Sequence, residues 1–523
     1  MSHSSALLQL LEEQLLQARR QAETVHARNA KGPTIQIPGI GKTISSAYEQ
    51  LRNAAEYTEE HLLLQRAIRR FYYRSLSFSA RKKNGEIGEE LIVELTQAGY
   101  IPNNTISNST ASAVTSLAEA YVETYRGLRD ARISRDQAMG WVLDLLSVET
   151  EAILNPHEEL AAVAYVAYQH YLNLFPREKL ASKPEEAKQY EICLYIAVHL
   201  ALLKSDRATV RHDLMRMYHQ DKNDLQAFVT FNRAVDERYG ARLTQKLKRA
   251  VSRYGAPMRV LKSMVEDRSD ISELLPDREA FLSAYSHQIS KEYRSVSKRL
   301  TKGIVKSIIF IFITKVIVGL AIEIPYDLLV IGHVAMLPLA INLLFPPLYM
   351  ASLKLGLKTP SLANAEALRG YIDQAFYGDS QPPASSLHLA TKPIPGLAKF
   401  VYTLLFFIPF AVTVYVLSLL NFNIVQGVIF FLFLSTASFL GFRLSRMVRE
   451  LELVTKQSNF LSTVRDFFYL PFIVVGQWIS SKYSKVNVVA YMLDIMIELP
   501  LKTVLRLIRQ WTRFLSERHD EMY

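Results

Sequence analysis

The longest stretch of the chain without a charged side chain constrains the fold most. No Asp, Glu, Lys or Arg occurs between Lys399 and Arg443. One bilayer-spanning helix needs about 20 apolar residues, and an amphipathic helix of a soluble core interrupts its apolar run every few residues. We therefore expect two crossings of a membrane, at residues 400–420 and 424–442, joined by Asn421, Phe422 and Asn423.

A second apolar hairpin precedes this stretch. Its first predicted span covers residues 303–322 and is followed by an acidic turn at 323–327. The second predicted span covers residues 328–350, where three prolines are expected to kink or end the helix. The sequence thus predicts a polytopic α-helical membrane protein with four spans.

Positive charge predicts the orientation of these spans. Much of the net charge of +11 lies beside the apolar segments, notably at Lys291, Arg294, Lys298, Arg299, Lys302 and Lys306, and at Arg443, Arg446 and Arg449. Because Lys and Arg are enriched in cytoplasmic loops, we expect both termini and the connector 351–398 to be cytoplasmic. The expected location is a cytoplasmic or inner membrane. The same placement favours anionic lipid over nucleic acid as a partner.

The first 300 residues are charge-rich and follow helical patterns. Leu8, Leu11 and Leu15 share one face of a helix predicted from Ser5 to Ala27. Strand alternation is not convincing anywhere, so we expect an all-α protein with a large N-terminal soluble domain, either a bundle or an irregular solenoid. Further helices are predicted at 43–75, 109–130, 134–154, 157–174, 184–204, 206–219 and 224–239.

These patterns divide the chain into six segments. They are an N-terminal helical pair (1–84), a cytoplasmic all-helical domain (85–300), a first transmembrane hairpin (301–350), a cytoplasmic connector with one short helix at 361–376 (351–398), a second transmembrane hairpin (399–443) and a C-terminal region (444–523).

The C-terminal region is expected to lie on the membrane rather than cross it. Residues 467–479 are apolar over too short a length to span and are interpreted as re-entrant or interfacial. Residues 500–518 combine an apolar stripe with basic residues set largely off it, which favours a helix in the headgroup plane. A helix packed in a protein core is the alternative. The candidate membrane-surface residues are Lys502, Arg506, Arg509, Trp511 and Arg513.

Chemical signatures are weak. The run ending in Gly41, Lys42 and Thr43 lacks the upstream glycine of a phosphate-binding loop, because that position is Gln36. A helix beginning His157–Glu158–Glu159 has Ala161 where a zinc-protease helix needs its second histidine. The single cysteine, Cys193, excludes an intramolecular disulfide framework and is predicted to be buried. No catalytic, cofactor or metal site is therefore predicted, and an enzyme is not expected.

One group of ionisable residues falls inside the first hairpin. Lys315 and His333 are predicted to lie at similar depths on antiparallel helices, with Glu323 and Asp327 at the mouth. Such residues can line a proton or ion path. If the hairpin is only an anchor, replacing Lys315 by leucine is expected to leave insertion at least as efficient as in the wild type.

These observations predict a multi-pass membrane protein that serves as an interaction, scaffolding or assembly component. Its expected partners are the lipid bilayer, through anionic head groups, and a protein bound to the cytoplasmic helical domain. The alternative is a transporter or channel subunit that moves protons or small solutes.

Overall fold

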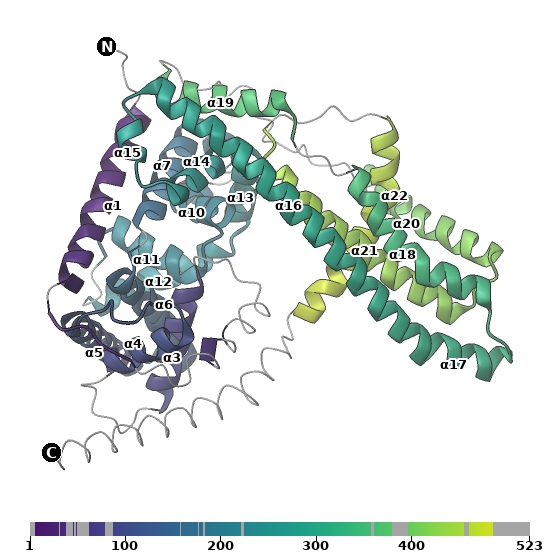
Figure 1. The fold of residues 1–523 in the computed structure, drawn as a ribbon, viewed down its shortest axis with the longest axis horizontal. Helices are drawn as coiled ribbons and strands as arrows, with labels where there is room; N and C mark the ends of the chain where they lie inside the picture. Colours follow the sequence, from purple (N-terminus) through teal and green to yellow (C-terminus); the bar gives the residue numbers. More distant parts are fainter. Residues whose placement is uncertain are drawn as a thin grey trace. The chain divides into compact units, whose positions relative to one another are not determined.

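The regular secondary structure is all helical in the residues that the computed structural model describes (Figure 1). In these residues the β-structure consists of one isolated bridge between Thr34 and Ser107. The described residues are 6–30, 32–37, 45–46, 49, 62–78, 87–156, 158–175, 177–180, 184–220, 224–356, 360–378, 396–453 and 460–484.

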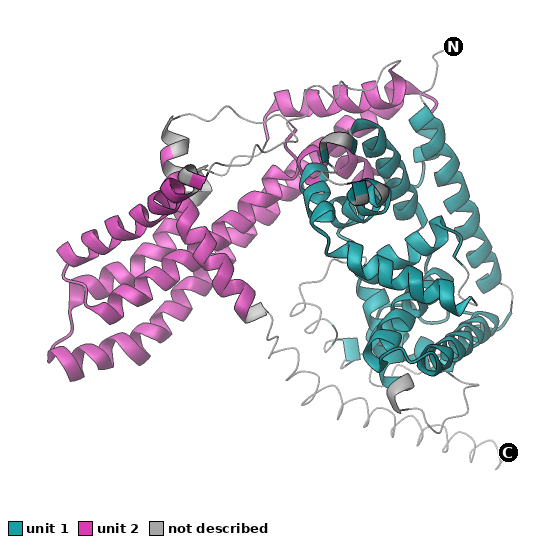
Figure 2. Cartoon of the chain, turned by 180° about the vertical axis from the view of Figure 1, so that it is seen from behind, with its two compact units in different colours: residues 1–251, 265–275, 487–523 teal, residues 252–264, 276–486 magenta. Residues whose placement is uncertain are grey.

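The chain divides into two compact units (Figure 2). Unit 1 comprises residues 1–251, 265–275 and 487–523, and unit 2 comprises residues 252–264 and 276–486. The domain boundary expected near residue 300 falls inside a continuous helix of unit 2, α16 (Arg278–Val318).

In unit 1, the helices predicted at 5–27, 109–130, 134–154, 157–174, 206–219 and 224–239 form within three residues of those bounds. The helix predicted at 184–204 is divided at residue 189, and part of the helix predicted at 43–75 lies outside the described residues. The helices at 87–98, 242–254 and 271–274 had no predicted bounds. Side chains of Ser107, Ser134 and Asp206 accept hydrogen bonds from backbone N–H groups in the first turns of α5, α6 and α11, which fixes where these helices begin. The unit contains α1 (Ala6–Ala30), α3 (Leu63–Phe78), α4 (Ile87–Ala98), α5 (Asn108–Asp130), α6 (Arg135–Leu154), α7 (Glu158–Leu174), α8 (Arg177–Leu180), α9 (Pro184–Lys188), α10 (Tyr190–Val198), η3 (His199–Leu203), α11 (Arg207–Met217), α12 (Leu225–Tyr239), most of α13 (Arg242–Tyr254) and α15 (Ile271–Leu274).

Helix α6 forms the centre of unit 1. Its residues are buried on nearly all sides, including the polar side chains of Asp144, Ser147 and Thr150. It packs against α3, α5 and α11, and Trp141 meets Phe228 of α12 edge to face. At the other side of the unit, α1 packs on α7 through the predicted face of Leu8, Leu11 and Leu15, which are all buried.

Unit 2 is built on long apolar helices. It contains α14 (Ala256–Asp267) through residue 264, α16, the π-helical turn η4 (Gly319–Glu323), α17 (Ile324–Tyr326), a second π-helical turn η5 (Asp327–Ile331), α18 (Met336–Gly356), α19 (Leu362–Tyr377), α20 (Gly396–Leu419), α21 (Ile424–Arg449) and α22 (Phe460–Ser484).

The turn of the first hairpin differs from the prediction. Residues 323–327, predicted as an acidic turn, are helical, and α16 continues through η4, α17 and η5 to Ile331. The chain reverses after Gly332, whose φ of 85° lies in the left-handed region that glycine tolerates. Pro346 and Pro347, expected to kink or end the second span, lie inside α18, which runs on to Gly356.

The second hairpin and the connector helix follow the prediction. Helices α20 and α21 flank the predicted turn, and Asn423 forms a capping box with Gln426 at the start of α21. Helix α19 begins after its N-cap Ser361, within a residue of the predicted start. Helix α22 is longer than the apolar segment 467–479 and packs along α21 and α20.

Three helical segments in the described residues are long and apolar enough to cross a membrane. They are Arg278–Ile331, Phe400–Leu419 and Ile424–Arg449. The apolar helix Met336–Ser352 is shorter. The predicted membrane-surface helix, with Lys502, Arg506, Arg509, Trp511 and Arg513, lies outside the described residues, as does the run from Gly39 to Thr43.

Candidate functional site

A cluster of polar side chains is buried among the apolar helices of unit 2. We call it the hairpin polar cluster and define it as Lys315, Glu323, Asp327, Asn342, Asn423 and Gln426. All six are at least partly buried, and Glu323, Asp327, Asn342 and Gln426 are fully buried. The cluster contains both acids of the predicted acidic turn at 323–327.

Lys315 and Glu323 form an ion pair at the centre of the cluster. The Lys315 Nζ donates to Glu323 Oε1 at 2.7 Å, and the two side chains are 1% and 0% exposed. The ammonium also lies 4.7 Å from the ring centroid of Phe433 on α21, a cation–π contact that adds to the attraction. The positive charge is thus compensated inside the helix bundle.

A π-helical turn brings these two residues to one face. They are eight residues apart, whereas two α-helical turns take about seven residues. The turn η4 accommodates an additional residue within the helix. Glu323 is thereby directed towards the same side as Lys315. Such π-helical turns are frequent at functional sites, so η4 and η5 indicate that this region of the hairpin is a candidate functional site.

Asn342 connects the ion pair to the second hairpin. Its Nδ2 donates to Glu323 Oε2 at 2.9 Å and to the carbonyl oxygen of Gln426 at 3.2 Å. Its Oδ1 is buried and has no hydrogen-bond partner among the described residues. A buried acceptor of this kind costs free energy unless a water molecule or another donor satisfies it.

Asp327 ties the ends of the two hairpins together. Its carboxylate accepts from Asn423 Nδ2 at 2.8 Å and from Gln426 Nε2 at 2.9 Å. It also accepts from the backbone N–H of Ala335 at 3.3 Å, directly before α18. One carboxylate therefore fixes the start of α21 and the turn of the first hairpin.

A small cavity borders the ion pair. Its volume is about 100 Å³, and Lys315 and Glu323 line it together with apolar residues of α16, η4 and α18, among them Leu339 and Leu343. A cavity of this size has room for a few water molecules. Its walls are otherwise apolar, so the cavity is a pocket at the ion pair rather than a polar channel.

The structure brings together three of the four residues of the predicted polar path. Lys315, Glu323 and Asp327 belong to the hairpin polar cluster, whereas His333 is exposed in the turn before α18. Asn342, Asn423 and Gln426 were not selected from the sequence. The sequence does contain a pattern that indicates them, because each is an amide side chain within or beside an otherwise apolar run.

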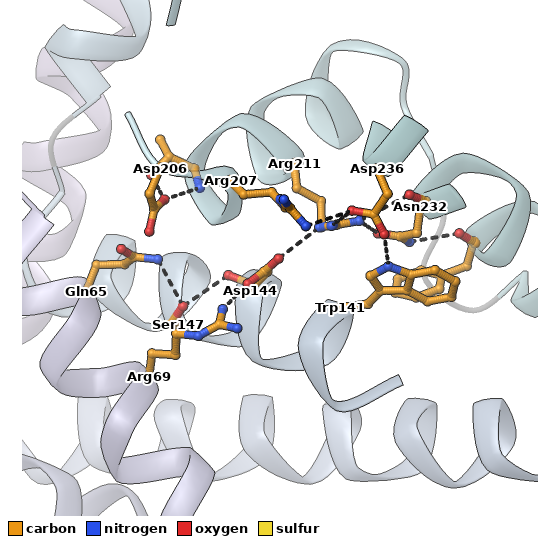
Figure 3. A network of polar contacts seen from close by, with 12 residues as sticks. Gln65, Arg69, Trp141, Asp144, Ser147, Asp206, Arg207, Arg211, Asn232 and Asp236 are labelled. Atoms are coloured by element: carbon orange, nitrogen blue, oxygen red, sulfur yellow. Dashed lines mark hydrogen bonds and ion pairs between the residues drawn. The ribbon is translucent and has the colours of Figure 1, made fainter. Parts of the chain in front are cut away.

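A second polar network lies in unit 1 (Figure 3). Arg211 of α11 is buried and donates to Asp144 at 3.1 Å, to Asn232 Oδ1 at 2.5 Å and to Asp236 at 2.5 Å. Asp144 also accepts from Arg69 of α3. Burial lowers the pKa of Arg211, and the neighbouring Asp236 opposes this shift.

This network joins four helices and borders a pocket of about 550 Å³. Asp144 lies on α6, Arg211 on α11 and Asp236 on α12, while Arg69 extends the network to α3. Trp141 donates its indole N–H to Asp236 at 2.8 Å. Because its positive and negative charges compensate each other, the network holds the four helices together and leaves no unpaired buried charge.

In the described part of the chain, no group of three or more His, Cys, Asp or Glu side chains is placed to hold a metal ion. Cys193 is buried, as predicted, and burial raises the pKa of its thiol.

Comparisons with protein-family models, curated proteins and solved structures found no significant match to this chain.

Proposed function

We propose that the chain is a multi-pass membrane protein that anchors a helical interaction or assembly domain at the cytoplasmic face of a membrane. Unit 2 supplies the spans in this proposal, and unit 1 supplies the surface for a protein partner. The observation that carries it is the contrast between the exposed apolar residues of unit 2 and its buried, paired charges.

The exposed surface of the unit 2 helices is apolar over long distances. Large apolar side chains are exposed on α16, η5, α18, α20 and α21, and Leu329 is 86% exposed. A soluble monomer seldom exposes contiguous apolar patches of this extent. Lipid tails would cover these side chains favourably.

The ionisable groups in the same region behave as membrane-embedded charges do. Lys315, Glu323 and Asp327 face the helix bundle and are paired or hydrogen-bonded. Ionisable residues in spans are expected to avoid lipid in this way. The pairing lowers the cost of insertion and leaves the apolar surface uninterrupted.

The closed geometry of the hairpin polar cluster favours an anchor over a conduit. Lys315 and Glu323 are almost fully buried, and their cavity is apolar apart from the ion pair. His333, the fourth residue of the predicted path, is exposed in the turn. A scaffold needs no continuous polar passage, which agrees with this arrangement.

A transporter or channel subunit for protons or small solutes is the second candidate. The cavity beside Lys315 favours it, and so does the unpartnered Oδ1 of Asn342, because a water molecule bound at either place would extend the polar cluster.

A flux measurement separates the anchor from a proton conduit. The full chain is reconstituted in liposomes that enclose a pH-sensitive dye, and a pH gradient is applied across the membrane. We expect the rate of dissipation to equal that of empty liposomes. A faster rate that Glu323→Gln abolishes, while reconstitution stays unchanged, would establish the conduit instead.

A further inference from the structure

One face of α16 changes from basic to apolar along its length. The exposed basic residues Arg294, Lys298 and Lys302 follow each other at intervals of four residues. The exposed apolar residues Val305, Ile309 and Phe312 continue at intervals of three or four. Residues at these intervals lie on one side of a helix, so the two groups form a single continuous stripe.

The opposite side of α16 is the packed side. Val296, Leu300, Ile304, Ile311 and Lys315 are buried and also recur at helical intervals. The basic-to-apolar stripe is therefore the face that the described residues of unit 2 leave exposed.

The basic part of this face is hollowed. His287, Ser290, Lys291, Arg294, Ser295 and Lys298 line a surface depression of about 320 Å³. Arg299, on the flank of the stripe, donates to Ser295 Oγ at 2.7 Å and so is directed back along the helix. Cationic and hydroxyl groups around such a depression are suited to a phosphate ester.

We propose that this face of α16 binds an anionic glycerophospholipid. The phosphate occupies the basic depression beside Arg294 and Lys298, and Lys302 binds the lipid between the depression and the apolar residues. The acyl chains extend along Val305, Ile309 and Phe312. The proposal rests on the proposed function, because the apolar half of the stripe faces acyl chains only if α16 crosses a bilayer.

The charge of the basic half of the stripe and the length of its apolar half together favour an anionic phospholipid. A free phosphate or a nucleic acid matches the basic half of the stripe but leaves the apolar half in water. A zwitterionic phospholipid covers the apolar half but provides no net negative charge for the basic residues. An anionic phospholipid satisfies both halves with one molecule.

A basic helix elsewhere in the chain provides a matched control. On α13, the exposed residues Arg242 and Arg249 lie seven apart on one face. The apolar residues Leu243, Leu247 and Val251 of α13 are buried, so its basic stripe has no exposed apolar continuation. Replacing Arg242 and Arg249 by glutamine removes two positive charges, the same change in net charge as replacing Lys298 and Lys302 by glutamine.

The test compares three full-length proteins in a mild non-ionic detergent: the wild type, Lys298→Gln with Lys302→Gln, and Arg242→Gln with Arg249→Gln. Native mass spectrometry measures the lipid bound after titration with phosphatidylglycerol or with phosphatidylcholine of the same acyl chains. We expect the wild type to prefer phosphatidylglycerol, the α16 variant to bind it about 25-fold more weakly, and the α13 variant to match the wild type.

Several outcomes would overturn the lipid site. These are equal binding of both lipids, an equal loss in the two variants, or displacement of bound phosphatidylglycerol by millimolar glycerol phosphate, inorganic phosphate or a short single-stranded DNA. Alkaline extraction of membranes tests the underlying proposal separately. Release of the wild type from membranes contradicts the membrane function itself, whereas retention without a lipid preference contradicts only the site on α16.

Discussion

Lys315 and Glu323 stabilise the apolar hairpin as a pair. From the sequence, Lys315 is a charge inside a span, and if the hairpin is only an anchor, replacing it by leucine is expected to leave insertion at least as efficient. In the structure this replacement leaves the Glu323 carboxylate buried without its 2.7 Å partner. The expected sign of the effect is therefore reversed.

Single substitutions of this pair are expected to be far more harmful than the double substitution. Lys315→Leu or Glu323→Leu leaves one buried charge uncompensated and should cost about 3–5 kcal/mol of stability. The double variant replaces the pair by apolar contacts and should recover most of this loss. Thermal unfolding of the purified proteins in detergent measures the effect. A double variant as unstable as the worse single one contradicts the pairing.

Glu151 of α6 provides a pH-dependent test in unit 1. Burial, with a smaller contribution from Asp206, raises the pKa of its carboxyl from 4.5 to about 8, and its Oε1 is buried without a hydrogen-bond partner among the described residues. The folded state therefore binds a proton more tightly than the unfolded state. This contribution to stability is complete below pH 4.5 and is lost as the pH rises through 8.

Replacing Glu151 by glutamine keeps the neutral form at all pH values. We expect Glu151→Gln to unfold at the same temperature as the wild type near pH 5. At pH 9 it should be more stable by about 1–2 kcal/mol, less than the pKa shift alone implies because the side chain is partly exposed. A difference that does not vary between pH 5 and pH 9 would exclude a buried neutral carboxyl.

At the scale of helices, close approach between α21 and α22 depends on Gly476. A Cβ atom at this position would lie 2.2 Å from the carbonyl oxygen of Ser435 and 2.7 Å from Cβ of Phe439. Neither contact can be relieved by rotating a flexible side chain end, so the helices must separate.

Gly476→Ala is therefore expected to destabilise unit 2 by about 1–3 kcal/mol. Gly427 of α21 is the matched control, because a Cβ atom there has no neighbour within 4 Å. Gly427→Ala should be neutral or stabilise by up to about 1 kcal/mol, since alanine loses less backbone entropy in a helix. Equal effects of the two substitutions, measured as unfolding temperatures, would contradict the packing of α22 on α21.

Most helices could be predicted from the sequence because local signals define them. N-caps such as Ser134 and Asp206, together with apolar periodicity, place α6 and α11 within a few residues. The turn of the first hairpin could not be predicted in this way. Glu323 and Asp327 carry the sequence signal of an exposed turn, but distant partners, Asn342, Asn423 and Gln426, keep them buried in a continuing helix.

The candidate site was predictable only in part for the same reason. Lys315 stood out as a charge within an apolar segment, and its depth suggested a neighbour on the next helix. Its ion-pair partner is instead on the same helical rod, brought into register by the π-helical turn η4. No local pattern in the sequence indicates that additional residue in the turn.

At the scale of the whole molecule, the two units expose different surfaces. Unit 2 exposes apolar side chains along its helices, whereas unit 1 buries its apolar residues in a core around α6 and neutralises its internal charges through Arg211. The proposed membrane-anchored scaffold accounts for both surfaces. This proposal, with the positive-inside rule, puts the turns of the two hairpins on the side of the membrane opposite to the basic residues that flank the spans.

Cysteine accessibility tests this arrangement most directly. Cys193 is buried and is replaced by serine to provide a background without thiols. Single cysteines are then introduced at His333 and Asn421 in the hairpin turns, and at Asp130 and Glu366, which are exposed on α5 and α19. A membrane-impermeant maleimide, which labels accessible cysteine thiols, is applied to intact cells and to permeabilised cells. We expect labelling of the two turn positions in intact cells, and labelling of the other two only after permeabilisation. Labelling of position 130 in intact cells, or protection of both turn positions there, would contradict this arrangement.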